Sequence, residues 1–167
     1  MINIKIQNLE KKLGKLIKRN ITVLGIDTAS RTGWAKITVN SKVKIDYGFI
    51  DITSKDRYFK FNQMIEIFPD LIKGCDKVII EDVYLKFNVM IHAMLSRIGM
   101  IVYVLAHQLG IKEKEFMWAS TARKNLGLKG NAKKEEMHKE FKEKYNINIE
   151  DEDIMDALIL AMNGILL

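Results

Sequence analysis

The chain has 167 residues, 48% of them hydrophobic and 29% charged, with a formal net charge of +6. This composition is typical of one globular domain and excludes a disordered or fibrous protein. The single cysteine, Cys75, excludes a disulfide framework and a zinc site built from cysteines. No uninterrupted apolar run approaches the ~18 residues of a membrane span, and the basic N-terminus lacks the apolar stretch of a secretory signal. We therefore expect a cytoplasmic protein with no membrane partner.

Charge is unevenly distributed along the chain. Residues 1–20 carry a net charge of +5 and residues 112–145 carry +4, whereas residues 146–167 carry −5. A basic majority with one concentrated acidic segment is typical of a protein that binds a polyanion and holds a cation locally. Lysine-rich helices that are merely solvated would give the same totals, so charge alone leaves the function open.

The stretch from residue 6 to residue 18 has apolar side chains at helical spacing and lysines at most other positions. It predicts a basic amphipathic helix within an N-terminal extension, residues 1–20, ahead of a domain over residues 21–167. Packing on the core or on a partner subunit is the favoured role of this helix, ahead of a DNA-contacting arm or a membrane-surface helix.

The next segments predict a sheet with helices packed on it. Three β-rich runs at 21–27, 32–39 and 43–52 are joined by links too short for a parallel crossover, so they predict an antiparallel meander. Strands are then expected at 77–82 and 115–119, and helices at 54–73, 87–109, 120–126, 133–145 and 151–164. Ser54 is expected to cap the first of these helices and Pro69 to kink or interrupt it. This order predicts an α/β fold with a five-stranded mixed sheet and helices on both faces.

The predicted helix over residues 87–109 is apolar nearly all round. A helix that is apolar on more than one face must be covered on two sides. In a domain of this size the sheet covers one side, so a second copy of the chain is expected to cover the other.

Acidic residues stand where predicted elements begin or end. Asp27 ends the first strand of the meander, Glu81 ends the strand at 77–82, and Asp153 and Asp156 lie in the first turns of the last helix. If these two strands are parallel neighbours, their ends share one edge of the sheet, where the helix adds two more acids. Four clustered carboxylates repel one another unless a cation neutralises them, and oxygen ligands favour Mg²⁺ or Mn²⁺. Such a site can hydrolyse a phosphodiester, although each acid alone is also explained by a turn or a helix cap.

Three segments, in this order, resemble motifs of the RuvC family of Holliday-junction resolvases, within the ribonuclease H-like superfamily. Leu24–Trp34 resembles Gly-Ile-Asp-Pro-Gly-Ser-Arg-x-Thr-Gly-Tyr/Trp, and Ile79–Tyr84 resembles the segment with the second acid and an aromatic three residues later. Asp153–Leu158 resembles the closing Asp-x-x-Asp-Ala-Leu helix. The resemblance covers about residues 21–165. It departs from the family where Thr28-Ala29 replaces Pro-Gly and the following loop is one residue shorter.

The resemblance implies a ribonuclease H-like fold in which Asp27, Glu81, Asp153 and Asp156 hold two Mg²⁺ ions, which Mn²⁺ could replace. The reaction implied is metal-dependent cleavage of branched DNA at paired sites, giving 5′-phosphate and 3′-hydroxyl ends. A four-way junction has two equivalent strands, so a homodimer formed through helix 87–109 would place one active site on each. If the chain is phage-encoded, it acts in the host cytoplasm. Dependence on an accessory helicase is left open.

The resemblance also implies roles for residues outside the acid cluster. Tyr84 falls where the family has an aromatic that stacks on an unpaired base at the branch point. Lys134 matches a basic residue that meets phosphate near the scissile bond, and one residue of register separates it from Lys133. Arg123 or Lys124 matches an earlier basic residue that contacts DNA.

Three other functions share some of these features. A ribonuclease H-like enzyme that cuts RNA–DNA hybrids would use the same acids. A basic DNA-binding protein with a decayed site would need no catalysis, although all four acids are present. The Gly-Ile-Asp…Thr-Gly hairpin also resembles the phosphate loop of actin-like ATPases, but those need two such domains and this chain has room for one.

Overall fold

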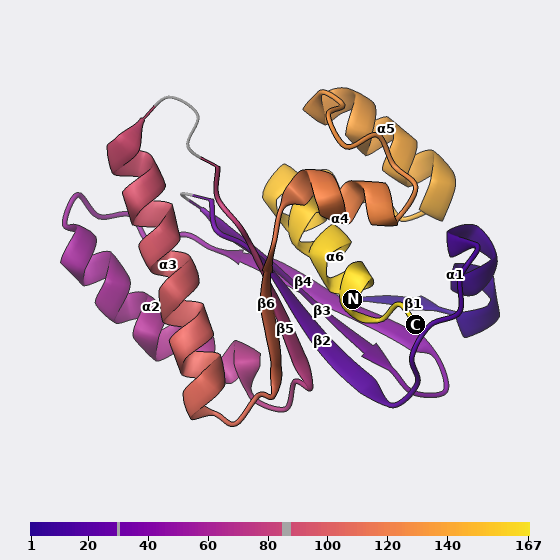
Figure 1. The fold of residues 1–167 in the computed structure, drawn as a ribbon, viewed down its shortest axis with the longest axis horizontal. Coiled ribbons are helices and arrows are strands. Elements are labelled where there is room, and N and C mark those ends of the chain that lie inside the picture. The colour runs from indigo at the N-terminus through magenta and orange to yellow at the C-terminus, as the bar shows by residue number, and fades with distance from the viewer. Residues whose placement is uncertain (30, 85–87) are drawn as a thin grey trace.

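The computed structural model describes residues 1–29, 31–84 and 88–167, with only the backbone of Lys134 described. Figure 1 shows one sheet with helices packed on both of its faces. The sheet has six strands in the order β1-β4-β3-β2-β5-β6. These are β1 (Ile2–Ile4), β2 (Ile21–Asp27), β3 (Thr32–Val39), β4 (Val43–Ile50), β5 (Lys77–Glu81) and β6 (Glu113–Met117). The α/β class with a mixed sheet is confirmed, but the predicted number of five strands was too low by one.

The middle of the sheet is the predicted antiparallel meander. β3 pairs antiparallel with β2 and with β4, and Gly33 lies opposite Asp27. On its other side β2 pairs with β5 in parallel, with Ile26 opposite Ile80. This parallel pairing brings the last residues of the two strands, Asp27 and Glu81, next to each other at one edge of the sheet.

The unpredicted strand, β1, belongs to the N-terminal segment, for which only a helix was predicted. It pairs antiparallel with the outer edge of β4. Three residues are too few for their alternation to be recognised in a sequence, and β1 forms here because β4 supplies its hydrogen-bond partners. The helix α1 (Ile6–Leu13) is shorter than the predicted 6–18, because Gly14 adopts a left-handed backbone conformation (φ 66°) that ends it.

Five further helices divide between the two faces of the sheet. α2 (Arg57–Ile72) and α3 (Val89–Gln108) cover one face. α4 (Ala119–Asn125), α5 (Lys134–Tyr145) and α6 (Glu152–Gly164) lie on the other side with α1. Each side has its own cluster of buried apolar side chains. Because the sheet is covered on both faces, the central strand β5 is apolar without alternation, with Val78, Ile79 and Ile80 all buried.

The start of α2 differs from the prediction, and Pro69 does not divide the helix. The side chain of Asp56, not Ser54, caps the helix by accepting hydrogen bonds from the backbone N–H groups of Tyr58 and Phe59. Ser54 instead accepts a hydrogen bond from the backbone of Asp56. Pro69 lies inside α2 without interrupting it: it has no N–H to donate to the carbonyl of Ile65, but the helix continues, and the backbone N–H of Lys73 donates to the carbonyl oxygen of Pro69 at 2.9 Å.

The last strand, β6, begins two residues earlier than the predicted 115–119. Its parallel register with β5 places Glu113 opposite Lys77 and Glu115 opposite Ile79. The ammonium of Lys77 forms ion pairs with Glu113, at 3.7 Å, and with Glu115, at 2.7 Å. Pairing with β5 therefore sets the limits of this strand, and Trp118 falls at the start of α4 instead of inside β6.

The N-terminal segment is packed into the same core as the rest of the α6 side. Leu9, Leu13 and Ile17 are buried there. The ammonium of Lys12 donates to the carbonyl oxygen of Tyr145 at 2.7 Å, at the C-terminal end of α5. Lys15 donates to the carbonyl oxygen of Asn125 at 2.8 Å, at the end of α4. These lysines satisfy carbonyl groups that helix ends leave without partners.

We expect the Leu9→Ala variant to lose about 2–5 kcal/mol of unfolding free energy, because it leaves a cavity in this core. Leu16, in the same segment, is 65% exposed, and Leu16→Ala is expected to change stability by no more than about 0.5 kcal/mol. Urea unfolding followed by circular dichroism measures both. Equal, small losses in the two variants would show that the N-terminal segment is not part of the cooperative unit.

α3 is covered on one side only by its own chain. Its predicted start at residue 87 lies outside the described residues; Asn88 caps the helix as described. Ile98, Val102 and Ala106 are buried against the sheet, whereas Met100 and Val104 are about half exposed. By length and composition α3 could cross a membrane, and it is the one such helix in the part of the chain described here. In this fold it is a surface helix of the α/β domain, and its outer face borders a hollow of about 640 Å³ against α2.

Candidate active site

The four predicted acids meet at one edge of the sheet. Asp27 ends β2 and is 5% exposed, and Glu81 ends the neighbouring strand, β5. Alternation along both strands points these two side chains to the face covered by α6. Asp153 and Asp156, in the first turns of α6, are close enough to raise the pKa of the Asp27 carboxyl by charge repulsion.

Two glycines allow α6 to approach the sheet closely enough to bring Asp153 and Asp156 near Asp27. A Cβ added to Gly25 of β2 would lie 2.1 Å from the carbonyl oxygen of Ala157. A Cβ added to Gly33 of β3 would lie 2.2 Å from the carbonyl oxygen of Asp153. Both distances are shorter than any van der Waals contact, so only glycine fits at these positions. Since Gly33 pairs with Asp27, its contact with α6 places the backbone of Asp153 over the end of β2.

Burial is the main reason that the pKa of Asp27 lies well above its ordinary value. A hydrogen bond to the Glu81 carboxyl and the negative charges of Glu81, Asp156 and Asp153 raise it further. Without a cation, this environment favours the protonated form of Asp27, which can donate to the Glu81 carboxylate. The next residue, Thr28, is also buried, and its hydroxyl has no hydrogen-bond partner among the described residues.

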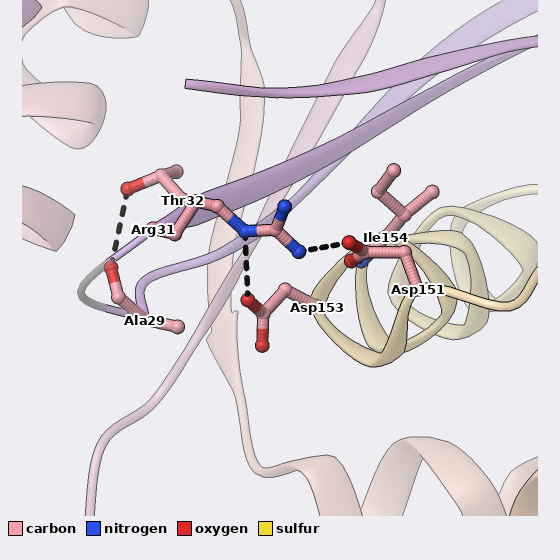
Figure 2. Close-up of polar contacts among 6 residues, drawn as sticks. All are labelled: Ala29, Arg31, Thr32, Asp151, Asp153 and Ile154. Carbon is pink, nitrogen blue, oxygen red and sulfur yellow. Dashed lines mark hydrogen bonds and ion pairs between the residues drawn. The ribbon is translucent and has the colours of Figure 1, made fainter. Parts of the chain in front are cut away.

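Arg31, in the turn between β2 and β3, forms ion pairs with two acids at the start of α6. Figure 2 shows its guanidinium between Asp151 and Asp153. Nε lies 3.7 Å from Oδ2 of Asp153, and the guanidinium lies over the ring of Phe49 at 4.2 Å. Asp151 also caps α6 by accepting a hydrogen bond from the backbone of Ile154. Arg31 thus holds the β2–β3 turn against the start of the helix.

Arg123 of α4 binds the remaining acid of α6. Its Nη2 lies 2.8 Å from both oxygens of Asp156, and Nε lies 3.3 Å from Oδ1. Both side chains are 13% exposed, so little water screens the pair. Asp153 and Asp156 are therefore each paired with an arginine.

The donor chemistry of the cluster fits a hard divalent cation. Carboxylate oxygens are the preferred ligands of Mg²⁺ and Mn²⁺, and the raised pKa of Asp27, caused by burial and by three neighbouring acids, is the kind of charge crowding that a cation relieves. No three acids, histidines or cysteines among the described residues are already arranged around a metal position. Because both oxygens of Asp156 lie 2.8 Å from Nη2 of Arg123, a cation would compete with this guanidinium for them.

The sequence model of the family described as "Crossover junction endodeoxyribonuclease RuvC" matches residues 23–163. The chain belongs to the RuvC family. The match begins after the N-terminal segment with β1 and α1, so the division of the chain near residue 20 stays a prediction. No curated protein matches the chain at a significant level.

Solved structures agree with the RuvC fold at low sequence identity. A Thermus thermophilus RuvC structure has a TM-score of 0.70 and 16% identity, over 85% of this chain and 92% of that one. T. thermophilus RuvC in complex with a Holliday junction substrate has a TM-score of 0.67 and 14% identity, over 85% and 90%. The yeast mitochondrial Holliday junction resolvase Ydc2 has a TM-score of 0.60 and 15% identity, over 92% and 81%.

The residues that the RuvC resemblance assigned to DNA lie in different surroundings. Tyr84, just beyond β5, is 76% exposed, and Lys124 and Lys133 are exposed at the ends of α4 and α5. The backbone of Lys134 begins α5, and its side chain lies outside the described part of the structure. Arg123, the alternative to Lys124 for the earlier predicted DNA contact, forms an ion pair with Asp156, and its role at DNA stays a prediction.

Two features near this edge of the RuvC fold were not predicted from the sequence. Arg31 lies inside the motif at residues 24–34, but the motif alone does not show that its guanidinium reaches α6. Trp118, 56% exposed, donates a hydrogen bond from Nε1 to Oδ2 of Asp82 at 2.7 Å. Its exposure depends on β6 ending at Met117, whereas the predicted strand at 115–119 placed Trp118 inside the strand.

Proposed function

We propose that this chain is a divalent-metal-dependent endonuclease that cleaves branched DNA, with Holliday junctions as its main substrate. The convergence of Asp27, Glu81, Asp153 and Asp156 on one edge of a RuvC-family fold carries this proposal. The T. thermophilus RuvC of similar fold is described in complex with a Holliday junction substrate. The net charge of +6 and the exposed lysines near the site suit a DNA ligand.

The four acids would hold two Mg²⁺ ions, which supply Lewis acidity and a water of lowered pKa for attack on the phosphodiester. Bound cations would favour the ionised form of Asp27, whose pKa burial and Glu81 raise in the cation-free protein. Asp156 prepares by separating from Arg123. The released guanidinium, with Lys134 or Lys133, then offsets negative charge on the phosphate. The cleaved DNA strands would carry 5′-phosphate and 3′-hydroxyl ends.

A panel of substrates tests this function. Four-way junctions, three-way junctions, linear duplexes and RNA–DNA hybrids of matched sequence are incubated with Mg²⁺, with Mn²⁺ and with EDTA. We expect paired cuts in the four-way junction with either metal and no cutting in EDTA. Preferential cutting of the hybrid would make the chain a ribonuclease H-like enzyme. Junction binding without cutting under every metal condition would identify a non-catalytic DNA-binding protein.

We also propose that two copies of the chain associate through α3. The apolar groove between α2 and α3 is lined by Phe61, Ile65, Met100 and Val104, and a solvent-exposed groove of this kind is unfavourable for an isolated chain. A dimer would place two equivalent sites on the two equivalent strands of a junction.

The Val104→Glu variant is expected to be a monomer, because it introduces a charge that pairing would bury without a partner. We expect its dimer dissociation constant to rise at least about 100-fold. Sedimentation equilibrium measures this, with Lys139→Glu on the exposed face of α5 as the charge-changing control. A wild-type protein that sediments as a monomer at micromolar concentration would contradict the proposal.

A further inference from the structure

Trp118 is an exposed aromatic side chain at the acid edge of the sheet. It directly follows Met117, which pairs with Glu81 in the β5–β6 register. Its side chain is 56% exposed, although tryptophan is a residue that folding normally buries for the most part. Neighbouring strands lie ~5 Å apart, so the backbone of Met117 is one strand from Glu81 and two strands from Asp27, roughly 5–10 Å across the edge, and Trp118 is the next residue.

A hydrogen bond holds the indole in place. Nε1 donates to Oδ2 of Asp82 at 2.7 Å, and the backbone N–H of Asp82 donates to the carbonyl oxygen of Met117 at 3.0 Å. A hydrogen bond to a carboxylate is stronger than one between neutral groups. The ring is therefore fixed relative to the two strand ends, with its apolar surface left to solvent.

The packing of the protein does not explain this arrangement. Trp118 belongs to neither of the two buried clusters, and its side chain makes no capping bond to α4. A flat, immobilised apolar ring beside a phosphodiester-cleaving site suits a nucleobase, because every base has an apolar face that stacks on an aromatic ring.

We propose that Trp118 stacks on an unpaired base of the DNA strand next to the scissile phosphate, with Asp82 as the residue that positions the indole. The proposal rests on the proposed function, since it needs branched DNA at this edge. It adds a second aromatic contact, at the residue that follows β6, to the exposed Tyr84 that follows β5. A base stacked on Trp118 would hold the DNA strand on the side of Glu81 that faces away from α6.

Fluorescence tests this contact directly, because the chain has two tryptophans. Trp34 is half-buried, with its ring against Gly48, so Trp34→Phe leaves Trp118 as the source of indole emission. This variant is mixed in EDTA with a four-way junction or with a linear duplex of the same sequence. We expect the junction to quench the emission in step with binding followed by anisotropy, and the duplex to quench it less.

Binding of the substituted proteins completes the test. In EDTA, Trp118→Ala is expected to bind the junction about 5- to 150-fold more weakly, the range for loss of one stacked base. Trp118→Phe keeps a stacking ring and is expected to lose less than Trp118→Ala. Asp82→Ala is expected to reduce the quenching at saturating junction, because the indole is no longer held. Leu16→Ala, an exposed apolar residue near the other end of β2, is the control and should bind as wild type does.

Unchanged Trp118 emission at saturating junction, or Trp118→Ala binding within two-fold of wild type, overturns the stacking assignment. In either case the proposed function stands if the wild-type protein still binds and cuts the junction. Failure of the wild-type protein to bind any branched DNA overturns both proposals, so the two failures are distinguishable.

Discussion

The Asp27→Asn variant is expected to lose cleavage of branched DNA by about 1,000-fold or more. Asp27 is the most deeply buried acid of the cluster. The negative charges of Glu81, Asp153 and Asp156 all repel its carboxylate. Asn keeps the shape of the side chain but supplies a neutral oxygen, which binds Mg²⁺ more weakly and removes charge from the site. Single-turnover cleavage of a four-way junction in Mg²⁺ measures the loss, and junction binding in EDTA should be retained.

The same substitution is expected to stabilise the cation-free protein at neutral pH. The pKa of Asp27 is raised in the folded state, so the folded protein binds a proton that the unfolded chain releases at its ordinary pKa of about 3.9. The stability that Asp27 contributes is present below that value and is lost as pH rises toward the raised pKa. In EDTA, Asp27→Asn should therefore unfold at a higher temperature than wild type near pH 8, and the difference should shrink near pH 4.

Mg²⁺ separates this effect from a general change in stability. Added Mg²⁺ should raise the unfolding temperature of the wild type, because it binds only the folded state, and should raise that of Asp27→Asn much less. Asp70→Asn, which removes an exposed acid from α2, is the control and should follow wild type in cleavage and in the response to Mg²⁺. Full cleavage activity in Asp27→Asn would exclude this acid as a ligand.

Much of the fold could be predicted because local patterns and the final packing agree. The meander follows from three β-rich runs with short links, and the positions of Asp27 and Glu81 follow from where those strands end. The parallel pairing of β2 with β5 then requires the two acids to be neighbours. The first turns of α6 could be placed as well, since Asp153 and Asp156 are three residues apart on one helix face.

The features that could not be predicted depend on contacts between segments far apart in the chain. β1 exists because the edge of β4 is available, and the limits of β6 follow from its register with β5. The ion pair of Arg123 with Asp156 joins residues 33 positions apart, so the sequence shows two charged residues but not their contact. Trp118 was assigned to the interior of a strand for the same reason.

The Gly33→Ala variant tests whether the close approach of α6 to the sheet builds the site. The added methyl group would lie 2.2 Å from the carbonyl oxygen of Asp153 and 2.8 Å from the backbone nitrogen of Ile154. These are backbone atoms, so relief requires the start of α6 to move away from β3. Because Asp153 and Asp156 lie on that part of the helix, both carboxylates move away from Asp27.

We expect two separate losses from Gly33→Ala. Overpacking should lower the unfolding free energy by about 1–3 kcal/mol. Cleavage of a four-way junction should fall by about 100-fold or more, since a misplacement of about 1 Å in a catalytic group has an effect of that size. Chemical unfolding and single-turnover cleavage in Mg²⁺, at a temperature where the variant is folded, measure the two losses.

Gly14→Ala provides a matched comparison for this variant. Gly14 has a positive φ of 66° and open space around its Cβ position, so the substitution strains the backbone without moving α6. It should lower stability by about 1–2 kcal/mol and leave cleavage unchanged, because the strain is confined to the end of α1. If Gly33→Ala cleaved as well as Gly14→Ala at equal stability, α6 could lie farther from the sheet without loss. The acids of α6 would then not be metal ligands, and Asp27 and Glu81 would have to hold the cation without them.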